Sequence, residues 1–328
     1  MTNVNNTGIG ISKLGNTDIE ISRIGLGTNA VGGHNLYDHL DEEKGKEFVR
    51  AAIDKGITFI DTADIYGKGR SEELVGEVLS EVPRENIILA TKGANEWFAD
   101  GSVVLNNKPA YLRKAFENSL KRLKTDYVDL YYLHFPDGKT PIGEAISELV
   151  KLKQEGKIRA IGVSNVTLEQ LKEANANGQI DALQMEYSML NRSVEKDLLP
   201  YCVEHHISFI PFGPLAFGLL GGKYTSAFKL TENDWRNSVP LFAEEQFEKN
   251  LSIVEKLQEF ACNKQITVGN LALAWLLAQE GVDAVIPGGK TSEQILESIR
   301  AAEVTLEKED LEVIDKILSS FSRKFSPL

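Results

Sequence analysis

The chain has 328 residues, of which 36 are Lys or Arg and 48 are Asp or Glu, so its formal net charge is −12. Hydrophobic residues make up 42% of the chain and charged residues 26%, a balance that is typical of a soluble globular protein and excludes a disordered one. The acidic excess argues against a protein that binds nucleic acid or an anionic membrane, because phosphate groups attract cations.

The two cysteines, Cys202 and Cys262, lack the close spacing of a zinc or redox motif and are too few for a disulfide framework. No apolar run reaches the ~18 residues of a membrane span, and the first ten residues lack the apolar segment of a signal peptide. We therefore expect a cytoplasmic monomer with one domain over residues 1–328, in which residues 1–10 are peripheral or disordered.

Short apolar runs recur along the chain, and most are nearly continuous in apolar and β-branched residues rather than alternating. Such runs are typical of strands buried on both faces of a parallel sheet, and helical patterns lie between them. The eight runs are Arg23–Thr28, Ile57–Asp61, Ile87–Lys92, Val128–His134, Ile158–Ser164, Ala182–Glu186, Ile207–Phe212 and Ala284–Pro287.

Eightfold alternation of strand and helix predicts an α/β fold of the (β/α)8 TIM-barrel type. Two additions are expected. Ile11–Leu14 and Ile19–Arg23 predict an N-terminal β-hairpin that closes the bottom of the barrel. The segment from Gly213 to Asp283, between the seventh and eighth strands, is long enough for a functional loop and two extra helices at about 242–280. A doubly wound open sheet is the alternative, but no G-x-G-x-x-G motif opens a strand–helix turn.

Polar residues follow the predicted strands at their carboxyl ends, where a barrel of this type places its active site. Asp61 ends the second run, Lys92 the third and His134 the fourth, and Tyr66 follows Asp61 closely. Taken singly, Asp61 could cap a helix, Lys92 could be solvated, His134 could be structural and Tyr66 could be packing. Because closure of the barrel brings these strand ends together, we interpret the four residues as a catalytic set.

This set suits proton donation to a carbonyl oxygen. A free tyrosine has a pKa of about 10, and a neighbouring ammonium, Lys92, is expected to lower the pKa of Tyr66. Asp61 would keep Lys92 charged, because a buried lysine without a partner loses its proton. His134 can donate a hydrogen bond to the substrate oxygen as charge develops there. The set contains no hydride source, so a nicotinamide cofactor is required, and no metal site is predicted.

The sequence resembles the aldo-keto reductases from about Leu14 to about Lys316. The opening segment, Leu26–Tyr37, is similar to a bacterial branch of that family associated with inositol catabolism. The segments that carry the family resemblance are Phe59–Gly67, Thr91-Lys92, Leu133-His134, Ile161–Asn165, Gln184 and Gly288–Gln294.

The resemblance implies NADPH-dependent reduction of an aldehyde or ketone, with NADH the less favoured cofactor. Tyr66 would donate the proton, Lys92 and Asp61 would tune it, and His134 would orient the carbonyl. Ser164, Asn165 and Gln184 would bind the nicotinamide carboxamide, and Phe212 would stack on its ring. The remaining cofactor-binding residues implied are Gly27, Thr28, Asn29 and Asp61 near the first two strands, Pro214, Leu215, Gly218 and Lys223 over the pyrophosphate, and Gly288, Gly289, Lys290, Thr291, Gln294 and Ser298 around the 2′-phosphate.

The phosphate region departs from the family pattern, because Lys290 is its one evident cation and Gln294 can instead form a capping box with Thr291. The sequence bears on three other interpretations. A cofactor-binding regulatory or redox-sensing subunit of the same fold stays open. A metal-dependent hydrolase is disfavoured by the single histidine among the strand ends, and a P-loop is excluded because its first glycine would fall at Ala284. The aromatic and histidine residues that could line the substrate site are His34, Tyr37, Trp97, Phe135, Phe217 and Trp235.

Overall fold

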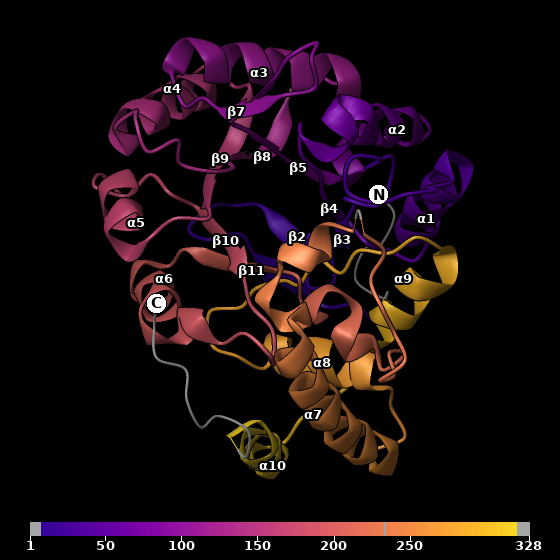
Figure 1. Cartoon of the computed structure of the whole chain (residues 1–328). Coiled ribbons are helices and arrows are strands. Elements are labelled where there is room, and N and C mark those ends of the chain that lie inside the picture. The colour runs from indigo at the N-terminus through magenta and orange to yellow at the C-terminus, as the bar shows by residue number, and fades with distance from the viewer. Residues whose placement is uncertain (1–7, 233, 320–328) are drawn as a thin grey trace.

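The computed structural model describes residues 8–232 and 234–319 (Figure 1). Seven strands form one parallel sheet with the order β11-β10-β9-β8-β5-β4-β3. Neighbours in sequence are neighbours in the sheet, as in a barrel. The strands are β3 (Leu26–Gly27), β4 (Phe59–Asp61), β5 (Ile88–Gly93), β8 (Val128–Leu133), β9 (Ile158–Ser164), β10 (Ala182–Glu186) and β11 (Ser208–Phe212).

The segment predicted as the eighth strand closes the barrel without forming a regular strand. Isolated parallel bridges join Phe209 to Val282 on one side and Gly27 to Gly288 on the other. Backbone hydrogen bonds run from Gly27 N to the Pro287 carbonyl and from Gly25 N to the Val285 carbonyl. Pro287 has no N–H to donate, and two glycines follow it, so a continuous ladder does not form. The expectation of a strand over Ala284–Pro287 is therefore corrected to a closing segment.

Ten α-helices are assigned within the described part of the chain, and most of them form a ring around the strands (Figure 1). Local sequence explains where several begin: Thr167 and Gln170 form a capping box at the start of α5, and Pro109 occupies the first position of α3. The helices are α1 (Glu42–Asp54), α2 (Arg70–Leu79), α3 (Pro109–Leu123), α4 (Ile142–Gln154), α5 (Leu168–Ala174), α6 (Leu198–His205), α7 (Glu244–Asn263), α8 (Val268–Leu277), α9 (Ser292–Ile299) and α10 (Lys308–Ser319).

The predicted N-terminal hairpin is confirmed as β1 (Ile11–Lys13) and β2 (Glu20–Ser22), which pair antiparallel. Leu14 and Ile19 are fully buried in one cluster with residues that line the barrel interior. The turn is held because Gly15 N donates to Ser208 Oγ at 2.6 Å, at the start of β11. Residues 1–7 lie outside the described residues, but Ile9, expected to be peripheral, is buried in the core.

Glycine 162 makes room for a large side chain inside the barrel. A Cβ atom on Gly162 would lie 2.2 Å from Tyr132 Cδ1, which is far inside van der Waals contact. The Tyr132 ring is fully buried, and its centroid lies 5.8 Å from Lys92 Nζ. The small residue on β9 therefore lets the β8 tyrosine fill the space beside Lys92.

The long segment after β11 contains the two expected helices, α7 and α8, preceded by three short 3-10 turns. These are η5 (Ala216–Gly221), η6 (Trp235–Ser238) and η7 (Pro240–Phe242). Within residues 8–232 and 234–319, none of the helices is long and apolar enough to cross a membrane.

Candidate active site

Three neighbouring strands bring together the four residues predicted as catalytic. Asp61 ends β4, Lys92 lies near the end of β5, and His134 directly follows β8. Tyr66 opens the 3-10 turn η2 (Tyr66–Gly69) that follows β4. Because parallel neighbours end at one edge, these side chains converge at the carboxyl end of the barrel.

The centre of this cluster is a buried ion pair. The Lys92 ammonium donates to Asp61 Oδ1 and, at 2.8 Å, to the Thr62 carbonyl. Burial raises the pKa of Asp61, while the Lys92 charge opposes that rise. For Lys92, burial acts to lower the pKa, but attraction to Asp61 and Tyr66 outweighs it and the pKa is raised. Lys92 therefore remains a cation at neutral pH.

Lys92 also faces the phenol that is predicted to donate the proton. Its Nζ lies 5.3 Å from the centroid of the Tyr66 ring. Even so, burial raises the pKa of Tyr66 above its ordinary value, and the Lys92 charge offsets only part of that rise. The Lys92 charge thus acts in the expected direction, but the net pKa of Tyr66 lies above its ordinary value because burial removes the phenolate from water.

His134 lies beside the phenol, with ring centroids 6.3 Å apart and planes nearly perpendicular at 84°. Phe135 stacks on the imidazole at a centroid distance of 4.4 Å. Burial and the nearby Lys92 charge hold the pKa of His134 well below its usual value. The imidazole is thus neutral at neutral pH, and it can donate a hydrogen bond from only one ring nitrogen.

The predicted carboxamide-binding residues meet this cluster from across the barrel. Gln184, on β10, donates from Nε2 to Asp61 Oδ2 at 2.9 Å, although β10 and β4 are not neighbours in the sheet. Ser164 Oγ donates to the Gln184 carbonyl at 2.8 Å, and Asn165 Nδ2 donates to the His134 carbonyl at 3.0 Å. The side-chain oxygens of Asn165 and Gln184 are left to accept, which suits the N–H groups of a carboxamide.

The residues at the end of the first barrel strand mainly make hydrogen bonds that hold the backbone of the neighbouring segments. The Thr28 hydroxyl donates to the Asp61 carbonyl at 3.0 Å, and Gly27 N bonds the closing segment. Asn29 Nδ2 donates to the Tyr37 hydroxyl at 3.3 Å. A Cβ atom on Gly288 would lie 2.9 Å from Asn29 Oδ1, so the two segments approach closely at this point.

The residues predicted to cover the pyrophosphate follow β11. Phe212 is its last residue and is half-buried, Pro214 is buried, and Leu215 caps η5. Gly218 has a φ of 103°, and a Cβ atom there would lie 2.8 Å from the Tyr224 hydroxyl. Lys223 is exposed. This turn requires glycine at position 218, since an L side chain would be strained there.

The predicted 2′-phosphate region lies at the start of α9. Gln294 Oε1 accepts from Lys290 N at 2.6 Å and Thr291 N at 3.2 Å, so its side chain is used as a cap. Ser298 is buried, and its hydroxyl donates to the Gln294 carbonyl at 3.0 Å. Lys290 is exposed and its Nζ lies 4.8 Å above the Tyr37 ring. Lys290 is thus the residue of this set whose chemistry fits a phosphate, while Gln294 and Ser298 serve the helix.

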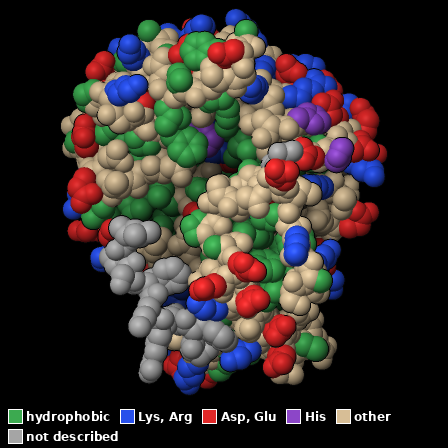
Figure 2. Space-filling model, viewed as in Figure 1, with side chains coloured by type: hydrophobic (Ala, Val, Ile, Leu, Met, Phe, Trp, Pro, Cys, Tyr) green, Lys and Arg blue, Asp and Glu red, His purple; other side chains and the backbone are tan. Residues whose placement is uncertain are grey.

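Several of the predicted wall residues gather on one side of the site. The Trp235 ring meets Phe217 at 5.1 Å and Tyr37 at 6.3 Å, both edge-on. The Trp97 ring packs under the Arg122 guanidinium, whereas His34 contacts Glu42 at the surface. Figure 2 shows a hollow near the middle of this face, bordered by hydrophobic side chains.

Two further buried residues belong to the site and were not predicted: Asn95, next to His134, and Asp64, next to Asn95. Asn95 Nδ2 lies 3.2 Å from both His134 Nδ1 and Asp64 Oδ1. Burial, with the nearby Glu72 charge, raises the pKa of Asp64 to about 8. Asp64 stands within the motif around Tyr66, but the contact between Asn95 and His134 joins two strands and has no signature in local sequence.

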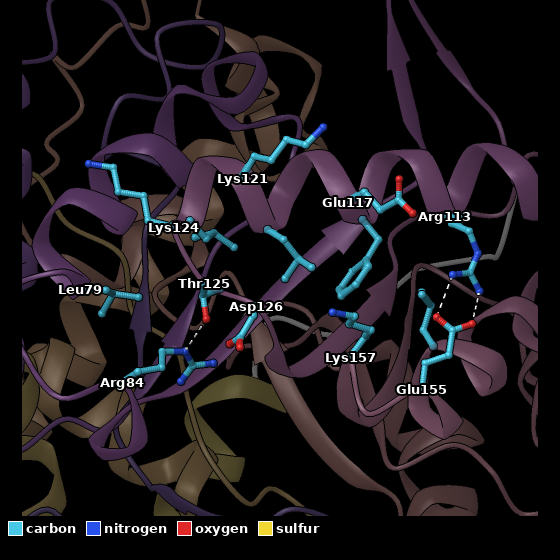
Figure 3. A pocket seen from close by; sticks show the side chains of 14 residues that line it. Leu79, Arg84, Arg113, Glu117, Lys121, Lys124, Thr125, Asp126, Glu155 and Lys157 are labelled. Carbon is cyan, nitrogen blue, oxygen red and sulfur yellow. Dashed lines mark hydrogen bonds and ion pairs between the residues drawn. The ribbon is translucent and has the colours of Figure 1, made fainter.

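A separate groove of about 800 Å³ lies at the opposite end of the barrel, before the strands β5, β8 and β9 begin (Figure 3). Its apolar floor includes Phe116 and Leu152, which are buried. Two of the cations at its edge are used in structural contacts: Arg113 pairs with Glu155 at 2.7 Å (Figure 3) and Arg84 pairs with Asp129 at 2.8 Å. The groove therefore belongs to the packing of α3 against α4 and not to the site.

The fold, the buried Asp61–Lys92 pair and the adjacent tyrosine and histidine together define an oxidoreductase of the barrel type. The Aldo/keto reductase family model matches residues 23–319, and the chain belongs to that family. It is an aldo-keto reductase, an enzyme that reduces carbonyl groups with a nicotinamide cofactor.

Relatives of known name agree with this assignment. The chain is 39% identical to Aldo-keto reductase YhdN of Bacillus subtilis over 94% of this chain and 93% of that protein. It is 35% identical to the NADH-specific methylglyoxal reductase of Escherichia coli, over 94% of this chain and 98% of that protein. It is 37% identical to the aldo-keto reductase yakc [NADP(+)] of Schizosaccharomyces pombe, over 90% of this chain and 87% of that protein. Among solved structures, the glycerol dehydrogenase AKR11B4 from Gluconobacter oxydans superimposes with a TM-score of 0.90 at 34% identity, covering 97% and 98% of the two chains. The similarity to an inositol-catabolism branch stays a prediction.

Proposed function

We propose that this enzyme reduces aldehydes or ketones to alcohols with NADPH and that Tyr66 donates the proton. The observation that carries the proposal is the buried Lys92 ammonium, which contacts Asp61 on one side and faces the Tyr66 ring on the other. A neutral His134 completes the cluster. As a monomer, the chain would hold this whole site by itself.

The chain has groups suited to each part of the cofactor. Asn165 and Gln184 would hold the nicotinamide carboxamide through their free side-chain oxygens, and Phe212 would lie against the ring. Lys290 would contact the 2′-phosphate, supported by the positive end of the helix dipole at the start of α9. When bound, the nicotinamide supplies the hydride.

The protein residues control the proton and the carbonyl oxygen. His134 donates a hydrogen bond that orients the oxygen and stabilises the negative charge that develops on it. Tyr66 transfers its hydroxyl proton to this oxygen, and the Lys92 ammonium stabilises the phenolate that remains. Asp61, fixed by Gln184, keeps Lys92 protonated and in place.

The choice of NADPH over NADH depends on Lys290. Named relatives use either cofactor, since one is NADH-specific and another carries NADP(+) in its name. Lys290 is exposed, so a phosphate can reach it without burying an unpaired charge. It lies over the Tyr37 ring, a contact worth about 0.5–1 kcal/mol at an exposed site, less than a charged hydrogen bond to phosphate.

The test is steady-state oxidation of NADPH with a panel of aldehydes and ketones, in wild type and in Tyr66→Phe. The variant should lose about 10²–10⁴-fold in kcat while the Kd for NADPH stays within about twofold, because the phenol moves a proton and does not hold the dinucleotide. Tyr127→Phe is the matched control, since Tyr127 packs under Arg84, at the opposite end of the barrel.

If Tyr66→Phe kept more than half of the wild-type rate with chemistry limiting, Tyr66 would not be the donor. A wild-type enzyme that binds NADPH tightly and turns over none of the carbonyl panel would favour the regulatory-subunit interpretation instead.

A further inference from the structure

Asn95 lies between an acidic side chain and the imidazole of the site. Its Nδ2 atom is 3.2 Å from Asp64 Oδ1 and 3.2 Å from His134 Nδ1. All three residues are buried, with 4%, 0% and 6% of their surfaces exposed respectively. Water therefore has little access to these contacts, and within the described residues Asp64 Oδ2 has no hydrogen-bond partner.

The acidic neighbour decides which way the Asn95 amide points. Asp64 Oδ1 accepts a hydrogen bond when the carboxyl group is ionised, and it still accepts when the proton resides on Oδ2. In either of these states the atom of Asn95 that faces Asp64 is the nitrogen, which carries two hydrogens, whereas a proton on Asp64 Oδ1 would face the amide oxygen instead. One hydrogen is directed to Asp64 and the other to His134 Nδ1.

The imidazole must then accept at Nδ1. Since this ring is neutral, a nitrogen that accepts carries no proton, and the single proton lies on Nε2. Nε2 is the nitrogen left to face a bound carbonyl oxygen. The opposite tautomer would present a lone pair to that oxygen and would repel it.

The backbone places Asn95 for this contact. Ala94, at the turn out of β5, is fully buried and has a φ of 141°, a region that residues other than glycine rarely adopt. Asn95 then begins the hairpin β6 (Asn95–Trp97) and β7 (Val103–Leu105). The Tyr111 hydroxyl donates to the Asn95 carbonyl at 2.5 Å and anchors the residue from α3.

We propose that Asn95 is a positioning residue that holds His134 in the tautomer with its proton on Nε2, through an amide oriented by Asp64. The inference rests on the proposed function for its catalytic meaning, because it makes His134 a hydrogen-bond donor to the carbonyl. The tautomer of His134 does not depend on turnover and can be measured without cofactor or substrate.

The direct measurement is nitrogen NMR of the full-length protein labelled with 15N-histidine. The chain has five histidines, and the His134 signals are those missing from the spectrum of His134→Gln. In wild type we expect Nε2 to carry the proton and Nδ1 to show the shift of an unprotonated, hydrogen-bonded nitrogen. A proton on Nδ1 in wild type would overturn the proposal without any variant of Asn95.

The second measurement uses Asn95→Leu, which keeps the volume and removes both hydrogens. We expect His134 to populate both tautomers, and kcat to fall roughly twofold to tenfold, the loss of one neutral hydrogen bond, with the Kd for NADPH unchanged. Tyr111→Phe is the control, because it loosens the same residue through its backbone and keeps the amide.

An unchanged tautomer in Asn95→Leu, or a changed tautomer with unchanged kcat, would overturn the positioning role. These outcomes are distinct from failure of the proposed function, which is judged from Tyr66→Phe and the carbonyl panel.

Discussion

Replacing Lys92 by Met tests whether the Lys92 charge compensates the buried Asp61 carboxylate. Lys92 and Asp61 are 0% and 1% exposed, so the substitution leaves a carboxyl group in the barrel interior without its cation. The remaining hydrogen bond to that carboxyl group is the one donated by Gln184 Nε2 at 2.9 Å. Removing one partner of a buried pair costs about 3–5 kcal/mol, and we expect the free energy of unfolding to fall by this amount at pH 7.

The deficit should depend on pH in a definite direction. Burial already raises the pKa of Asp61 in the wild type, and loss of the Lys92 charge raises it further. A carboxyl group whose pKa is higher in the folded state than in the unfolded state favours folding when protonated. Its contribution is complete below the unfolded pKa of about 3.9 and is lost as pH rises through the folded pKa. The deficit of Lys92→Met relative to wild type should therefore shrink on acidification.

Equilibrium unfolding in urea, followed by circular dichroism at pH 7 and pH 5, measures both effects. The double variant Lys92→Met/Asp61→Asn removes the stranded charge and keeps an acceptor for Gln184, so it should recover most of the lost stability although it remains inactive. A double variant that is as unstable as Lys92→Met, or less stable, would refute the argument that an uncompensated Asp61 charge causes the loss.

Two further predictions concern the cofactor and the barrel interior. Lys290→Met should weaken the binding of NADPH by about tenfold to a hundredfold and leave the binding of NADH almost unaffected, because NADH has no 2′-phosphate. Fluorescence titrations that show equal weakening for the two cofactors would exclude Lys290 from the phosphate site. Gly162→Ala should destabilise the protein by about 1–3 kcal/mol or more, since its methyl group would lie 2.2 Å from Tyr132 Cδ1. Gly143→Ala in α4 is the control, because its methyl group would come no closer than 3.8 Å to Glu173 Oε1 and a helical alanine is favoured; similar unfolding midpoints for the two variants would contradict the packing argument.

The architecture could be predicted because buried parallel strands leave a local pattern. The runs around Phe59, Leu130 and Ile161 are nearly continuous in apolar residues, and each became a strand that is buried except at Arg159. The hairpin at Ile11–Ser22 was visible from its turn residues. The eighth run was predicted in the correct place but not in the correct form, because Pro287 and Gly288 disrupt the ladder.

Local sequence is enough to show which residues stand at the strand ends, because Asp61, Lys92 and His134 each end an apolar run. Their contacts depend on the folded barrel, since its closure joins Gln184 to Asp61, 123 positions apart, and Asn95 to His134, 39 positions apart. The pKa of Tyr66 was decided in the same way, since desolvation depends on every atom packed around the phenol and not on the one lysine that a motif displays.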